Sequence, residues 1–237
     1  MFGQLTAWPR VRRLVSWTTA IVFTLEVAII DLQAMRGVTS HFNVATLFDR
    51  VLFFVMGAAI LTQTAISVAV AYALWRQPFT DRVLGWALRL GMTLTIAGAL
   101  TGPLMTRPSA TQLDHMRAGE SVSAVGAHTV GGTDGGPGLP VTGWSREHGD
   151  VRVPHFVGLH ALQALAIVAL WLARRRRPEF ARVRMMLVAA GSYAALFLLL
   201  LAQALRGFGG ASEVDGARAN ERLRPSQVLD DSSTQIH

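Results

Sequence analysis

Residues 185–205 of the chain read MMLVAAGSYAALFLLLLAQAL, a run without a single charged side chain. The hydrocarbon core of a bilayer is about 30 Å thick, so roughly 20 apolar helical residues are needed to cross it. Four other stretches have similar length and little or no charge: residues 14–32, 51–75, 84–106 and 153–173. The pattern predicts an all-α fold, a polytopic transmembrane helical bundle with five spans.

The composition leaves room for one membrane domain and little else. Of the 237 residues, 51% are apolar, and the mean hydropathy is +0.36. We predict a transmembrane helical domain over residues 1–206, with a long Gly/Pro-rich outer loop at 107–152, and a disordered polar tail over 207–237. The sequence contains no cysteine, which excludes disulfides and thiolate metal sites.

The basic residues indicate the topology. All 22 are arginine and the net charge is +7, but they flank the spans, which favours contact with lipid headgroups over a nucleic-acid partner. The short connections on one side contain Arg10, Arg12, Arg13, Arg76, Arg82, Arg174, Arg175, Arg176, Arg177, Arg182 and Arg184. The positive-inside rule therefore predicts a cytoplasmic N-terminus, with the 107–152 loop and the C-terminus outside. Arginine richness without lysine is typical of GC-rich bacteria, so the predicted location is a bacterial cytoplasmic (inner) membrane.

Ionisable residues inside the spans are candidates for function, because burial in a membrane makes each of them costly. Glu26 lies in the first span, which lacks a small-residue cleavage site and is predicted to be an uncleaved helix. The fourth span runs the other way and places His160 at a similar depth, with Gln163 one turn below it. Asp31 and His155 also lie at similar depths on these two spans, nearer the outer surface. We therefore predict that the first and fourth spans are neighbours and that Glu26 contacts His160 or shares a ligand with it.

Further polar residues precede or follow the spans on the outer side. His41 lies before the second span, and Asp49 lies at its start, where it is predicted to be a solvated helix terminus. His128 belongs to a segment, 126–140, too dense in glycine and proline to be helix or strand. This segment is either a lid over an outer cavity or a plain connection. Alternatively, His41 and His155 are simple interfacial residues. His115 and His148 are predicted to be exposed.

The third span contains a GxxxG pattern, Gly98 to Gly102, which lets another backbone approach closely. Packing within the chain is the favoured interpretation, and a homodimer through Gly98 and Gly102 is the alternative. Pro103 is expected to kink or end this helix. Arg89 lies near the inner edge, where its side chain can reach the interface.

Several motifs lie between residues 127 and 163: AHTVG at 127–131, GGPGLP at 135–140, WS at 144–145, GDVR at 149–152 and HFVGLHALQ at 155–163. This block, and the SHFN segment at 40–43, resembles a group of uncharacterised bacterial multi-pass membrane proteins. The resemblance implies a membrane architecture and a role for these residues, and no activity. Gly143 stands where an asparagine would be expected before the WS pair, which weakens the case for a polar role there.

Three classes of function remain open. The first is a protein that binds haem or a transition metal through histidines near its outer face. The second is a proton-coupled transporter or channel subunit, and the third is a ligand-free accessory or assembly protein beside other membrane subunits. No catalytic residue is identified. The candidate cofactor-binding residues are His160, His155, His41 and His128, with Glu26, Asp31, Gln163 and Asp49 as ionisable or amide partners. His155 and His160 lie about 140° apart on a helical wheel, so at most one is expected to ligate, with His160 preferred.

Overall fold

The computed structural model describes residues 8–132 and 134–207, and most of them are helical. The helices are α1 (Pro9–Met35), α2 (Leu47–Arg76), α3 (Arg82–Ala99), α4 (Gly102–Met105), α5 (Ala110–Arg117), α6 (Arg152–Leu159), α7 (Ala161–Ala173) and α8 (Glu179–Arg206). A short antiparallel ribbon pairs β1 (Thr129–Val130) with β2 (Gly149–Asp150). The predicted disordered tail lies, apart from Gly207, outside the described residues.

Four helical runs are long and apolar enough to cross a membrane: α1, α2, the run Arg82–Arg117 and α8. The pair α6 and α7 makes a fifth if it is counted as one span, although the two helices are bent by 43°. The helical fold with membrane-length apolar helices is therefore confirmed. The count of five spans stays a prediction.

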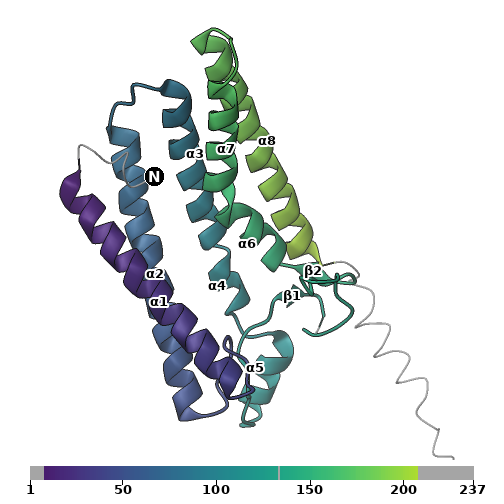
Figure 1. The fold of residues 1–237 in the computed structure, drawn as a ribbon. Helices are drawn as coiled ribbons and strands as arrows, with labels where there is room; N and C mark the ends of the chain where they lie inside the picture. The colour runs from purple at the N-terminus through teal and green to yellow at the C-terminus, as the bar shows by residue number, and fades with distance from the viewer. Residues whose placement is uncertain (1–7, 133, 208–237) are drawn as a thin grey trace, which may run out of the picture.

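Helix α3 lies at the centre of the arrangement (Figure 1). It packs against α2 on one side and against α6, α7 and α8 on the other, while α1 packs on α2. One apolar cluster joins α1, α2 and α3 through Val15, Val70, Leu74 and Leu88. A second joins α3, α7 and α8 through side chains that include Leu165, Leu172 and Met186.

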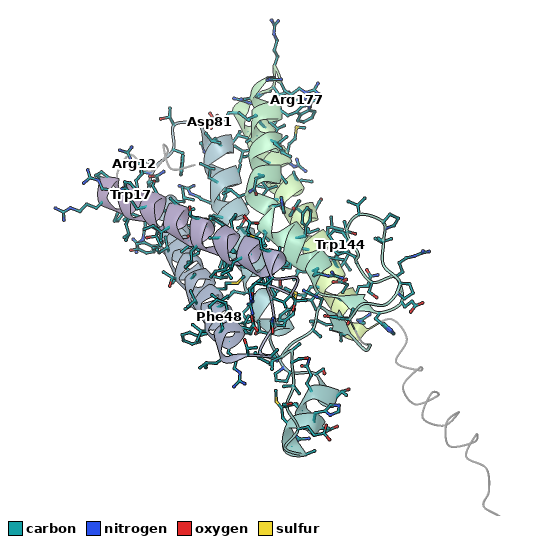
Figure 2. All side chains as sticks on the ribbon, turned by 60° about the horizontal axis from the view of Figure 1, so that its bottom comes forward. Arg12, Trp17, Phe48, Asp81, Trp144 and Arg177 are labelled. Atoms are coloured by element: carbon teal, nitrogen blue, oxygen red, sulfur yellow. The ribbon has the colours of Figure 1, made fainter. Side chains whose placement is uncertain are left out.

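The arginine-rich connections lie together at one end of the molecule, which we call the arginine-rich end. Figure 2 shows Arg12, Asp81 and Arg177 there. An ion pair of 3.7 Å between Arg82 and Glu179 links the start of α3 to the start of α8. The opposite, loop-rich end holds residues 36–46 and 106–151 and the end of α8, as expected for helices that alternate in direction.

The backbones of α3 and α6 touch at Gly98 and Gly158. A Cβ on Gly98 would lie 2.5 Å from Gly158 Cα, closer than real contacts allow, and one on Gly102 would lie 3.5 Å from the His155 ring. The GxxxG pattern is thus used for packing within the chain, the favoured interpretation. A homodimer through the same glycines stays a prediction.

Two terminal contacts shape α2 and α3. The guanidinium of Arg89 donates to the carbonyls of Leu74 (2.9 Å) and Gln77 (2.8 Å), so it caps the end of α2 instead of simply reaching the interface. Helix α3 ends at Ala99, a few residues before Pro103, as the sequence predicts.

The span predicted to be continuous over 153–173 is broken at His160. Side chains on neighbouring helices bind the backbone groups at the break: the Tyr193 hydroxyl donates to Val157 O (2.6 Å), and Leu162 N donates to Thr95 Oγ1 (3.2 Å). These partners replace helical hydrogen bonds, so Val157 O and Leu162 N are paired at the break.

The long loop is hydrogen-bonded to the segment between α1 and α2 and to the end of α4. Val125 N donates to Phe42 O and Ala127 N donates to Met105 O, both at 2.9 Å. The prediction that 126–140 contains no strand is wrong at Thr129–Val130, because these residues pair with Gly149–Asp150, further along the chain. These hydrogen bonds fix the loop at several points. The interpretation of the loop as a lid over an outer cavity stays a prediction.

Candidate functional site

Asp49 is a deeply buried ionisable group at the loop-rich end, and its side chain is 2% exposed. Its Oδ1 accepts from Arg36 (2.6 Å) and Gln33 (3.0 Å), and its Oδ2 accepts from the Thr46 hydroxyl (2.6 Å). Thr46 is also the N-cap of α2, so the local sequence places this carboxylate at the helix start. The prediction of a solvated helix terminus is wrong, because Arg36 and Gln33 arrive from the end of α1. Both oxygens of Asp49 are occupied, and the cluster ties α1 to α2.

His128 is held by a carboxylate in the long loop. Asp134 accepts from the His128 and Thr129 backbone amides, from the Thr129 hydroxyl (2.6 Å) and from His128 Nδ1 (3.1 Å). Partial burial alone would raise the pKa of Asp134, but these hydrogen bonds and the nearby His128 lower it below its ordinary value. An ionised carboxylate only accepts hydrogen bonds, so His128 Nδ1 carries a proton.

His41 and His128 both lie beside the ring of Phe42. The centroid of Phe42 is 4.8 Å from that of His128 and 6.3 Å from that of His41. The pKa of His41 lies below its ordinary value, first because neighbouring groups desolvate the partly exposed imidazole and second because His128 is close. His41 Nδ1 is 2.9 Å from Ser40 Oγ. The two histidines therefore form one cluster, which we call the His41–His128 site.

His155 contacts the junction of α3 and α4, further from the loops. Its Nδ1 lies 2.9 Å from Gly98 O and 3.0 Å from Thr101 Oγ1, and the Thr101 hydroxyl itself donates to Gly98 O (2.7 Å). A carbonyl only accepts, so His155 Nδ1 is protonated and the ring orientation is fixed. This contact supports the close packing of α3 and α6.

The predicted contact between Glu26 and His160 is wrong. Helix α1 packs on α2, with α3 between that pair and the helices α6 and α7 (Figure 1), so the first and fourth spans are not neighbours. Glu26 is half-buried, His160 is exposed with its Nδ1 2.7 Å from Phe156 O, and Asp31 and Gln163 are exposed. Equal depth in the membrane does not determine which helices are adjacent.

Within residues 8–132 and 134–207, no group of three or more His, Cys, Asp or Glu side chains could hold a metal ion. A metal there would therefore have at most two of these side chains as ligands and would need water or another molecule to complete its coordination. Of the four predicted cofactor-binding histidines, the structure brings His41 and His128 together, whereas His155 contacts α3 and His160 contacts Phe156.

Two aspartates organise the loop, although neither was predicted from the sequence to have a role. Besides Asp134, the buried Asp150 accepts from Ser145 N (2.8 Å) and forms an ion pair with Arg152 (2.6 Å). Burial alone would raise the pKa of Asp150, but the hydrogen bonds from Arg152 and from the backbone lower it. The signal available in the sequence was an aspartate beside glycine in each case, at Asp134-Gly135 and Gly149-Asp150, typical of turns in which the side chain binds backbone amides.

No protein-family model, curated protein or solved structure matches this chain. The resemblance of residues 126–163 to bacterial multi-pass membrane proteins stays a prediction.

Proposed function

We propose that the chain is a multi-pass protein of a bacterial cytoplasmic membrane, and that its outward-facing His41–His128 site binds a transition metal, either as an ion or as haem iron. Membrane-length apolar helices and the gathering of arginines at one end support the first part. By the positive-inside rule, the arginine-rich end faces the cytoplasm and the loop-rich end faces outward.

The observation that carries the metal proposal is the hydrogen bond from His128 Nδ1 to Asp134, 3.1 Å long. A histidine whose Nδ1–H is held by a carboxylate presents its Nε2 lone pair in a fixed direction, and carboxylate–histidine–metal arrangements work in this way. Metal binding also requires neutral imidazole. The lowered pKa of His41 keeps that ring neutral at neutral pH, when protons would otherwise compete for it.

Two imidazoles leave coordination positions open for water or an external ligand. Such a site suits an exchangeable or reactive metal better than a structural one, which is normally enclosed by four protein ligands. Imidazole suits copper, zinc and haem iron. Because the loop-rich end is proposed to face outward, the metal or its external ligand would reach the site from the outer solution.

The other two functional classes gain less from the structure. A proton path through Glu26 and His160 loses its basis because the two residues lie on helices that do not pack together. The ligand-free accessory role is the outcome if the binding test fails.

The test is copper titration of the full chain, purified in detergent with a tag that contains no histidine. Cu²⁺ binds imidazole sites more tightly than other divalent first-row metals, so it is the most sensitive probe. We expect one site, with affinity lowered by His128→Ala and lowered roughly 10- to 100-fold by Asp134→Asn, which removes the orienting carboxylate. A parallel titration with haemin, followed by its absorption band, distinguishes haem from a free ion.

His115→Ala is the matched control, because His115 Nδ1 also hydrogen-bonds a carboxylate, that of Glu120, on the exposed surface of the same loop. It should bind copper like the parent. The proposal is refuted if the parent binds neither copper nor haemin, or if His115→Ala and His128→Ala lose affinity equally.

A further inference from the structure

A groove between α7 and α8 opens at the arginine-rich end, far from the His41–His128 site. Its volume is about 360 Å³. The apolar side chains along it are Val168, Trp171 and Leu172 from α7 and Met185, Val188 and Ala189 from α8. Arg184 is the charged residue that lines it. The groove thus combines an apolar trough with a cation at its edge.

The surroundings of the groove add more positive charge. Residues 174–184 contain six arginines and one acid, Glu179, which pairs with Arg82. The Arg175 guanidinium lies 4.1 Å from the centre of the Trp171 ring, so it is held over the groove wall. Arg177 extends from the tip of the α7–α8 turn (Figure 2).

One further arginine atom lacks a partner. Arg182 Nε is buried and makes no hydrogen bond to any described residue. Arg182 precedes Met185 and Ala189 by three and seven positions, so it shares their face of α8. Because this nitrogen has no exposed surface, Arg182 adds positive charge beside the groove without contacting a ligand there.

We propose that this groove binds one anionic phospholipid of the cytoplasmic leaflet, with an acyl chain along the apolar trough and the phosphate between Arg184 and Arg175. Guanidinium groups bind phosphate oxygens through paired, charge-assisted hydrogen bonds, and they prefer a lipid with net negative charge to a zwitterionic one. The proposal rests on the membrane insertion proposed above and is independent of the metal site.

Native mass spectrometry of the full chain tests the proposal after reconstitution in phosphatidylcholine with or without phosphatidylglycerol. The parent should retain one phosphatidylglycerol and no phosphatidylcholine in its place. Each arginine near a membrane surface contributes about 1 kcal/mol, so Arg175→Gln with Arg184→Gln should weaken retention by roughly 25-fold. Ala189→Phe, which fills the trough, should also displace the lipid, and circular dichroism verifies that each variant is folded.

The matched control is Arg10→Gln with Arg12→Gln, which removes the same charge from the same end of the molecule without touching the groove. This variant should keep the lipid. Equal retention of the two lipids by the parent would overturn the proposal, and so would equal loss in both double variants, which would mean diffuse attraction. Carbonate extraction of cells tests membrane insertion separately, and copper titration tests the metal site.

Discussion

Gly98→Ala should destabilise the fold, because Gly98 is where α3 meets the backbone of α6. A Cβ there would lie 2.5 Å from Gly158 Cα, about 0.9 Å inside the 3.4 Å at which ordinary contacts begin. The obstructing atoms are backbone and cannot rotate away, so α3 and α6 must separate. Overpacking of this kind costs about 1–3 kcal/mol, here near the upper end. The better helix propensity of alanine returns about 1 kcal/mol, which leaves a net loss of about 2 kcal/mol.

The assay is unfolding of the detergent-solubilised protein by SDS, followed by far-ultraviolet circular dichroism. Gly191→Ala is the control, because a Cβ at that position of α8 meets nothing within 4 Å, and this variant should be unchanged or stabilised by up to about 1 kcal/mol. Gly158→Ala should resemble Gly98→Ala, and the double variant should lose less than the sum because both changes act on one contact. The reasoning fails if Gly98→Ala is as stable as Gly191→Ala.

Three further predictions follow from the loop-rich end and from the topology. Asp49→Asn should lower the melting temperature clearly more than Asp31→Asn, because Asp49 is buried with three side-chain donors and Asp31 is exposed; equal effects would contradict the buried cluster. In a nuclear magnetic resonance titration, His41 should have a pKa below its ordinary value, and His128→Ala should raise that pKa by removing a repulsive neighbour. Copper binding should be lost as the pH falls through the pKa of His41, because the protonated ring cannot bind the metal. An unchanged His41 pKa in His128→Ala would show that the two rings are not coupled. The chain has no cysteine, so single cysteines can be introduced at the exposed positions of Val141 in the long loop and Phe180 at the other end. Val141→Cys should react with an impermeant maleimide on intact cells, whereas Phe180→Cys should react only after permeabilisation. The reverse pattern would show that the topology is the opposite of the predicted one.

The helices were predictable because hydropathy is a local property. Residues 185–205 lie inside α8, and the other apolar stretches coincide with described helices except at Leu100, Thr101, Thr106 and His160. The break at His160 was not predictable, because it depends on Tyr193 and Thr95 from other helices. A strand at Thr129 was missed for the same reason, since its partner lies far along the chain.

The site was predictable only in part. Sequence position indicated that His41 and His128 belong to one side, and the structure brings them together around Phe42. The contact predicted for Glu26 was wrong, because the depth of a residue in the membrane does not determine the order of the helices around α3. Its position at a helix start made Asp49 look solvated, whereas its charged partner is Arg36 at the end of another helix.

The most direct test of the proposed metal site is electron paramagnetic resonance of the Cu²⁺-loaded protein, prepared with ¹⁵N-labelled histidine. We expect coupling to two histidine nitrogens in the parent and in His115→Ala, and to one in His41→Ala and in His128→Ala. A spectrum that keeps the same histidine coupling in all four proteins, or shows none in the parent, would contradict the His41–His128 site.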